Sequence, residues 1–179
     1  PCFFGVFVWD FVDQGVRIKN EDGSTFIGYG GDSGETTHDG HFCGNGLVFA
    51  DRELKPGIKE MKYLYQNVTF REIDAEKGIF EITNNFPFTN LSEYNLHWQL
   101  VNENRVNASG DISLDIAPGE TARIELSFDR VPETECYLNV MLELNRSCRW
   151  AKAGHIVANE QFIIHKHIFR KAEIEDVPM

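Results

Sequence analysis

The sequence predicts a mainly β protein, in which an antiparallel β-sandwich follows a shorter segment of a different kind. From residue 62 onward, seven short apolar runs separated by turn sequences recur at regular spacing, which is typical of a sandwich. Before it, residues 3–9 read F-F-G-V-F-V-W, without the alternation of a half-solvated strand. Such a run indicates a strand buried on both faces, as in a parallel sheet.

Composition and charge exclude several classes of function. The 179 residues are 42% hydrophobic, too apolar for a disordered chain, yet no stretch reaches the roughly 20 apolar residues of a membrane span. The net charge of -11 repels nucleic acid, so we expect neither nucleic acid nor a membrane as partner. The cysteines lack C-x-x-C spacing, so we expect free thiols in a reducing, cytoplasmic setting: Cys2, Cys43, Cys136 and Cys148.

The first segment, residues 1–60, has too little core to fold as a complete domain, because one apolar strand and a long loop cannot offset the entropy of ordering them. Its first residues lack an initiator Met and a signal pattern, which indicates a cut inside a longer protein. A hairpin is predicted at Asn20–Gly23, between V-R-I-K and T-F-I-G-Y. Pro56 opens a short helix that reaches about Met61.

The second segment, residues 62–170, carries the strands of the sandwich, and residues 171–179 form a charged tail. Alternating apolar positions place one face on a core, as at Leu96, Trp98 and Leu100 and again at Ile112, Leu114 and Ile116. The predicted strands are 63–73, 78–84, 93–102, 105–115, 121–127, 136–145 and 160–169.

Several polar and aromatic residues are candidates for chemistry. Trp9 ends the buried strand and precedes a long polar loop, the arrangement found at the rim of a (β/α)8 barrel, where an indole can stack on a sugar ring. Asp10, Asp13, Asp32 and Asp39 include no pair that the spacing singles out as glycosidase acids, and aspartates in glycine-rich loops usually form turns. His165 and His167 share a strand face and could bind a metal, but the pattern favours solvated strand histidines.

Three motifs make the sequence resemble the large β-galactosidases of glycoside hydrolase family 2. They are V-W-D-F-V-D-Q-G at residues 8–15, Y-G-G-D at 29–32, and F-C-x-N-G-L-V-F-A-D-R at 42–52, the last of which is the most specific. The stretches L-H-W at 96–98 and W-A-x-x-G-H at 150–155 look like the following domain of that family. The resemblance therefore spans nearly the whole chain.

The resemblance implies a fold and a set of site residues. The fold is an immunoglobulin-like β-sandwich preceded by a partial (β/α)8-barrel segment. Trp9 matches a tryptophan of the galactose pocket, with a peptide link to Asp10 that can be cis. Phe42 and Asn45 match the substrate-pocket residues that hold sodium, through a main-chain carbonyl and an amide oxygen. Magnesium and both catalytic glutamates belong to parts of the family outside this chain, which has no catalytic residue of its own.

The expected function is a part of a retaining β-galactosidase that hydrolyses terminal β-D-galactosides, with the chain by itself inactive. β-Galactoside is the expected partner of the intact enzyme, and the sequence leaves room for a homo-oligomer. One alternative is a non-catalytic sandwich that acts as a spacer or a carbohydrate-binding module through Trp98 or Trp150, although Trp98 fits a core position better. Another is a β-glucuronidase or β-mannosidase of the same family, against which the F-C-x-N-G string argues.

Overall fold

A computed structural model describes residues 5–128 and 134–166, and the chain divides into two compact units. Unit 1 comprises residues 1–65 and unit 2 comprises residues 66–179. Cys2, His167 and the predicted tail 171–179 lie outside the described residues.

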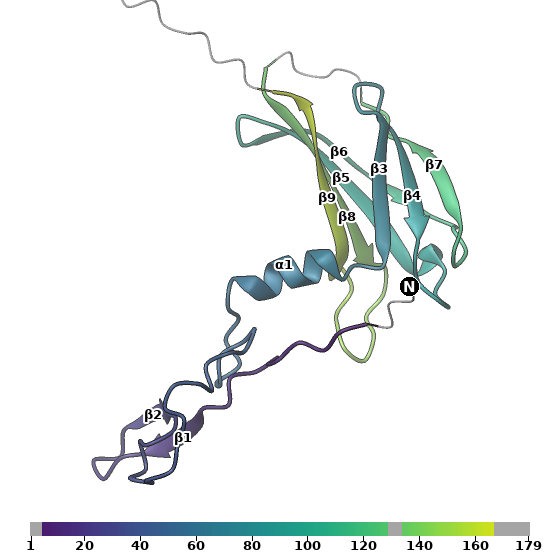
Figure 1. Ribbon diagram of the computed structural model, residues 1–179. Coiled ribbons are helices and arrows are strands. Elements are labelled where there is room, and N and C mark those ends of the chain that lie inside the picture. The colour runs from purple at the N-terminus through teal and green to yellow at the C-terminus, as the bar shows by residue number, and fades with distance from the viewer. Residues whose placement is uncertain (1–4, 129–133, 167–179) are drawn as a thin grey trace, which may run out of the picture. The chain divides into compact units, whose positions relative to one another are not determined.

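Unit 2 is a sandwich of two antiparallel sheets, as the alternating pattern predicts (Figure 1). One sheet has the strand order β3-β4-β7 and the other β6-β5-β8-β9. The strands are β3 (Val68–Asp74), β4 (Ile79–Asn84), β5 (Tyr94–Asn102), β6 (Arg105–Ser113), β7 (Thr121–Glu125), β8 (Cys136–Leu144) and β9 (Ile156–His165). The chain passes from one sheet to the other after β4, after β6 and after β7, which is the crossing pattern of immunoglobulin-like sandwiches.

The core of unit 2 lies between the two sheets, because alternate residues of each strand point inward. In β5 the predicted face of Leu96, Trp98 and Leu100 is buried. β8 alternates strictly between buried and half-buried positions along its whole length. The Trp98 indole lies against the Phe128 ring, with centroids 5.9 Å apart, and it covers Gly110, where a Cβ would come within 2.9 Å of the indole nitrogen. Trp98 is therefore a core residue.

One polar side chain, Asn84, is fully buried among these apolar groups. Its amide nitrogen donates to the backbone carbonyls of Thr89 and Ile116, both at 2.9 Å, and its oxygen accepts from the N–H of Phe86 at 3.0 Å. Thr89 lies shortly before the 3-10 helix η1 (Leu91–Glu93), which precedes β5. Asn84 therefore fastens two irregular segments to the end of β4.

Unit 1 contains a hairpin, a set of loops and one helix. Strands β1 (Val16–Lys19) and β2 (Thr25–Gly28) pair in register from Val16 with Gly28 to Lys19 with Thr25. The turn at residues 20–24 closes with the N–H of Asn20 bonded to the carbonyl of Ser24, which confirms the predicted hairpin. Helix α1 (Gly57–Leu64) begins after Pro56, as predicted, and ends three residues beyond Met61.

The buried strand predicted at Phe3–Trp9 is not present in the part of it that the structure describes. Residues 5–9 have no strand conformation, and Val6, Phe7 and Trp9 are exposed. A strand exists only where neighbours complete its hydrogen bonds, and the described residues of unit 1 pair no strand with this run. The predicted strand 63–73 is wrong in its first residues, because α1 continues to Leu64 and β3 begins at Val68.

The last predicted strand, 160–169, begins four residues earlier than expected, at Ile156.

Within the described ranges 5–128 and 134–166, no helix is long and apolar enough to cross a membrane. Cys43, Cys136 and Cys148 carry free thiols, as predicted for these three.

Candidate functional site

The candidate site of unit 1 is built where two segments far apart in the sequence run side by side. The N–H groups of Leu47 and Val48 donate to the carbonyls of Asp10 and Phe11, at 3.1 and 3.0 Å. In return, the N–H groups of residues 13 and 14 donate to the carbonyls of residues 48 and 43, both at 3.0 Å. This backbone pairing brings the end of the Val8–Gly15 motif against the Phe42–Arg52 motif.

Trp9 and Phe42 line one hollow of about 300 Å³ on unit 1. Both rings are open to solvent, with 78% of Trp9 and 73% of Phe42 exposed. The peptide bond between Trp9 and Asp10 is cis, as the resemblance implied. The remaining lining is mainly polar and comes from Gln14, Gly30, His38, Asp39, Gly40 and Cys43. Two exposed aromatic faces beside amide, imidazole and carboxylate groups suit a ligand with both C–H faces and hydroxyl groups.

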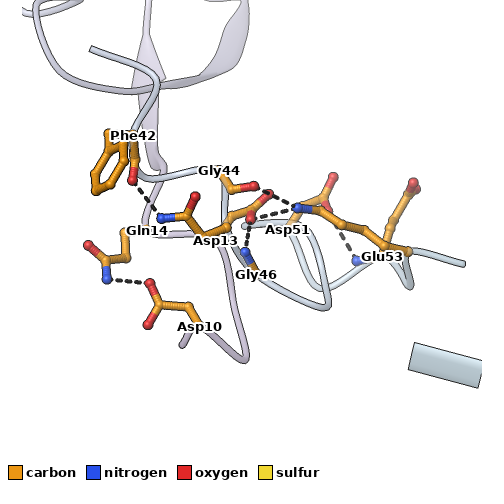
Figure 2. Close-up of polar contacts among 10 residues, drawn as sticks. Asp10, Asp13, Gln14, Phe42, Gly44, Gly46, Asp51 and Glu53 are labelled. Carbon is orange, nitrogen blue, oxygen red and sulfur yellow. Dashed lines mark hydrogen bonds and ion pairs between the residues drawn. The ribbon is translucent and has the colours of Figure 1, made fainter. Parts of the chain in front are cut away.

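Phe42 and Asn45 are joined directly. The Asn45 side chain donates from Nδ2 to the main-chain carbonyl of Phe42 at 2.8 Å (Figure 2). Half a turn about the last torsion of Asn45 exchanges Nδ2 with Oδ1, which would present two neutral oxygens side by side. Neutral carbonyl and amide oxygens are ligands that suit a hard cation such as sodium. The two residues therefore fit as a partial cation site that needs further oxygens.

A half-buried ion pair contacts this loop. Lys55 Nζ donates to Asp13 Oδ1 at 2.7 Å and to the carbonyl of Gly44 at 3.2 Å, and the same Asp13 oxygen accepts from the N–H of Gly46 at 2.6 Å (Figure 2). Lys55 was not among the residues that the sequence singled out. The pair spans 42 positions, so no local pattern could have revealed it.

The Asp13 carboxyl makes the stability of unit 1 depend on pH. The hydrogen bond from Lys55, with a further one from the Gly46 N–H, lowers the pKa of the Asp13 carboxyl below its ordinary value, against the opposing effect of burial. A lowered folded pKa means that this carboxylate stabilises unit 1 above the ordinary pKa of aspartate and ceases to do so as the pH falls through the folded value.

We expect Asp13→Asn to reduce the acid sensitivity of unit 1. Amide exchange of residues 43–48 as a function of pH measures this, and an unchanged pH profile would contradict it.

The other candidate acids form no opposed pair. The Asp10 carboxylate accepts from Gln14 Nε2 at 2.5 Å, and Asp32 accepts from the N–H of Tyr29 at 2.8 Å, as a turn-forming aspartate does. Asp39 lines the hollow. In the part of the chain that the structure describes, which includes His165 but not His167, no three His, Cys, Asp or Glu side chains gather to hold a metal ion.

The two tryptophans of unit 2 have different environments. Trp98 is buried in the core, which rules out its use as a sugar platform. Trp150 lies between β8 and β9, is 66% exposed, and meets the His155 ring edge-on with centroids 5.4 Å apart. Trp150 therefore remains available to a ligand.

Comparison with known proteins identifies both parts of the chain. Residues 1–70 match the TIM barrel domain of family 2 glycosyl hydrolases, and residues 80–165 match domain 4 of β-galactosidase. The first match confirms the predicted barrel segment, which the structure of unit 1 does not reveal, and the second agrees with the sandwich of unit 2.

Individual relatives agree with the family matches. A β-galactosidase of Priestia megaterium is 39% identical over 168 residues, which are 92% of this chain and 16% of that protein. β-Galactosidase 2 of Enterobacter cloacae is 36% identical over 94% of this chain, and a β-galactosidase of Photobacterium profundum is 34% identical over 92%. The chain spans 16–17% of the length of these three relatives.

Proposed function

Since the chain belongs to family 2 of the glycosyl hydrolases, as a stretch that runs from the TIM barrel domain into β-galactosidase domain 4, we propose that it is part of a retaining β-galactosidase. The substrates are terminal β-D-galactosides of the lactose type. They are hydrolysed by two closely placed carboxyl groups, one of which forms a covalent galactosyl intermediate while the other acts as general acid and then as general base. One observation carries the proposal: Trp9 and Phe42 line the same hollow, and the amide of Asn45 is bonded to the main chain of Phe42.

Trp9 and Phe42 supply one wall of the galactose pocket. The indole of Trp9 offers a flat apolar face to the C–H face of the sugar, where dispersion and desolvation both favour contact. Its exposure leaves that face free for a ligand. In this proposal Phe42 is the second aromatic of the wall and also contributes its main-chain carbonyl to the ion site.

Phe42 and Asn45 hold sodium in the intact enzyme, through the carbonyl oxygen of the former and the amide oxygen of the latter. The ion supplies a fixed positive charge beside the substrate. The remaining oxygens come from substrate, water or other parts of the enzyme, and the magnesium of the intact enzyme is held by residues outside this chain.

The catalytic glutamates lie outside this chain, which supplies pocket and ion-site residues only and is inactive by itself. Removing one member of such a catalytic set already costs many orders of magnitude in rate. The free thiols of Cys43, Cys136 and Cys148 support a cytoplasmic location. The assembly of the intact enzyme as a homo-oligomer is part of the same proposal.

Sodium titration of the whole polypeptide that the gene encodes, followed by the ²³Na NMR line width, tests the ion site. We expect line broadening with the wild-type polypeptide and its loss in Asn45→Ala, because the alanine removes a ligand oxygen. The matched control is Asn85→Ala, which removes an exposed amide from unit 2. Equal broadening in wild type and Asn45→Ala, or none in wild type, would contradict a sodium site at these residues.

A second candidate function is carbohydrate binding by unit 2, which the exposed Trp150 favours. If unit 2 is a binding module, calorimetry with galactose and other sugars gives a heat of binding that Trp150→Ala removes and Trp9→Ala leaves unchanged. If the pocket of unit 1 binds the sugar instead, Trp9→Ala removes the heat of binding and Trp150→Ala leaves it unchanged. If the wild-type chain gives no heat of binding, unit 2 acts as a spacer.

A further inference from the structure

Lys55 connects three points of unit 1 that lie around Asn45. Its ammonium bonds to the Asp13 carboxylate and to the carbonyl of Gly44, the residue before Asn45. The same carboxylate oxygen bonds to the N–H of Gly46, the residue after Asn45. Both neighbours of Asn45 are thus held by one ion pair, on the two sides of the side chain that reaches Phe42.

The ion pair is shielded from water more than an ordinary surface pair. The exposed fractions of the side chains are 21% for Lys55 and 13% for Asp13. The ammonium also lies over the Phe49 ring, 5.0 Å from its centroid, and the backbone N–H of Lys55 donates to the carbonyl of Leu47. Shielding strengthens a charge-assisted hydrogen bond, and it makes the loss of one partner costly for the other.

Backbone bonds also tie the Phe42–Gly46 loop to residues 10–14. The N–H of Gln14 donates to the carbonyl of Cys43 at 3.0 Å, and the N–H of Asp10 donates to the carbonyl of Asn45 at 3.5 Å. The N–H groups of Phe42 and Gly44 bond to the carbonyls of residues 39 and 41, at 3.2 and 3.1 Å, which fixes the local turn. The contacts of Lys55 and Asp13 add a side-chain anchor on each side of Asn45, at Gly44 and Gly46.

We propose that Lys55 is a positioning residue of the ion and substrate site, which acts through Asp13 and Gly44 to hold Phe42 and Asn45 in place. This inference rests on the proposed function for the meaning of the site, but the loop geometry can be tested without substrate or sodium. Lys55 itself touches neither the hollow nor the Asn45 side chain in the contacts described above.

Amide hydrogen exchange of the full 179-residue chain, followed by NMR, tests the proposal. In Lys55→Met, which keeps the length of the side chain and removes its charge, exchange at Gly44 and Gly46 becomes at least about tenfold faster, because a charge-assisted bond is lost. Exchange at Asn20 in the β1–β2 hairpin stays unchanged. Lys55→Arg, which retains a cationic donor, restores protection at both glycines. Lys77→Met is the matched control, because it removes an exposed ion pair of unit 2.

Unchanged exchange at Gly44 and Gly46 in Lys55→Met would overturn the proposal. Equal acceleration at Asn20 would also overturn it, because Lys55 would then support unit 1 as a whole. If Lys55→Met unfolds unit 1, Asp13→Asn is the second test, because its amide oxygen can still accept a hydrogen bond from the N–H of Gly46. Faster exchange that is confined to the loop in Asp13→Asn supports the proposal. Exchange at the wild-type rate in the loop contradicts it. If the loop responds in this way while the whole polypeptide that the gene encodes binds no sodium, the proposed ion site is wrong and the positioning role stands.

Discussion

Asn84→Ala is expected to lower the free energy of unfolding of unit 2 by about 3 kcal/mol, since it removes three hydrogen bonds of a fully buried side chain that each contribute about 1 kcal/mol. The carbonyls of Thr89 and Ile116 and the N–H of Phe86 lose their side-chain partner at half-buried or buried positions. Alanine also leaves a small cavity at the end of β4. Urea unfolding, with the midpoint and the slope recorded separately, measures the change.

The adjacent asparagine provides the control. Asn85 is exposed, and its side chain donates to the Thr69 hydroxyl at 2.8 Å. We expect Asn85→Ala to change the free energy of unfolding by less than about 1 kcal/mol, because water replaces the lost bond. Similar losses in the two variants would show that Asn84 is not the fastening point of the segments around residues 89 and 116.

Gly46→Ala is expected to disrupt the pairing of residues 10–14 with residues 43–48. A Cβ at this position would lie 2.2 Å from the backbone nitrogen of Asp13 and 2.7 Å from the carbonyl oxygen of Val48. Both neighbours are main chain, so no side chain can rotate away, and the two segments must separate. Overpacking typically costs about 1–3 kcal/mol, and a clash with backbone on two sides belongs at or above the top of that range.

Gly44→Ala is the matched control two residues away. A Cβ there has His41 as its nearest neighbour, with the carbonyl oxygen at an ordinary 3.5 Å. Amide exchange at Val48 and Asp13, which bond across the pair, should accelerate strongly in Gly46→Ala and little in Gly44→Ala. Equal effects of the two alanines would mean that the close approach at Gly46 does not exist in solution.

The sandwich could be predicted from the sequence because its signal is local. Leu96, Trp98 and Leu100 alternate with polar residues, and a strand with one buried face needs only that alternation. The same alternation placed Trp98 in the core, and the turn sequence at residues 20–23 predicted the hairpin. The ends of the elements were less exact, since α1 extends to Leu64, where a strand had been expected.

The first segment was harder to predict, because an apolar run indicates that a segment is buried but does not indicate which other segments cover it. Residues 5–9 were expected in a strand and have no strand partner among the described residues of unit 1, which are 5–65. At the site, Trp9, Phe42 and Asn45 were found through motif resemblance, and the structure brings the first two to one hollow. Lys55 was missed because it lies outside the three motifs and its partner Asp13 is 42 positions away in the sequence.

The account depends on the galactose pocket that Trp9, Phe42 and Asn45 help to line, and the most direct measurement is made on the polypeptide that the gene encodes. It is assayed with nitrophenyl β-D-galactoside, β-D-glucuronide and β-D-mannoside, in the wild type and in Trp9→Ala. The account predicts hydrolysis of the galactoside with retention of configuration, and a loss of that activity in Trp9→Ala. Hydrolysis of the glucuronide or mannoside in its place, or full galactosidase activity without the Trp9 indole, would contradict it.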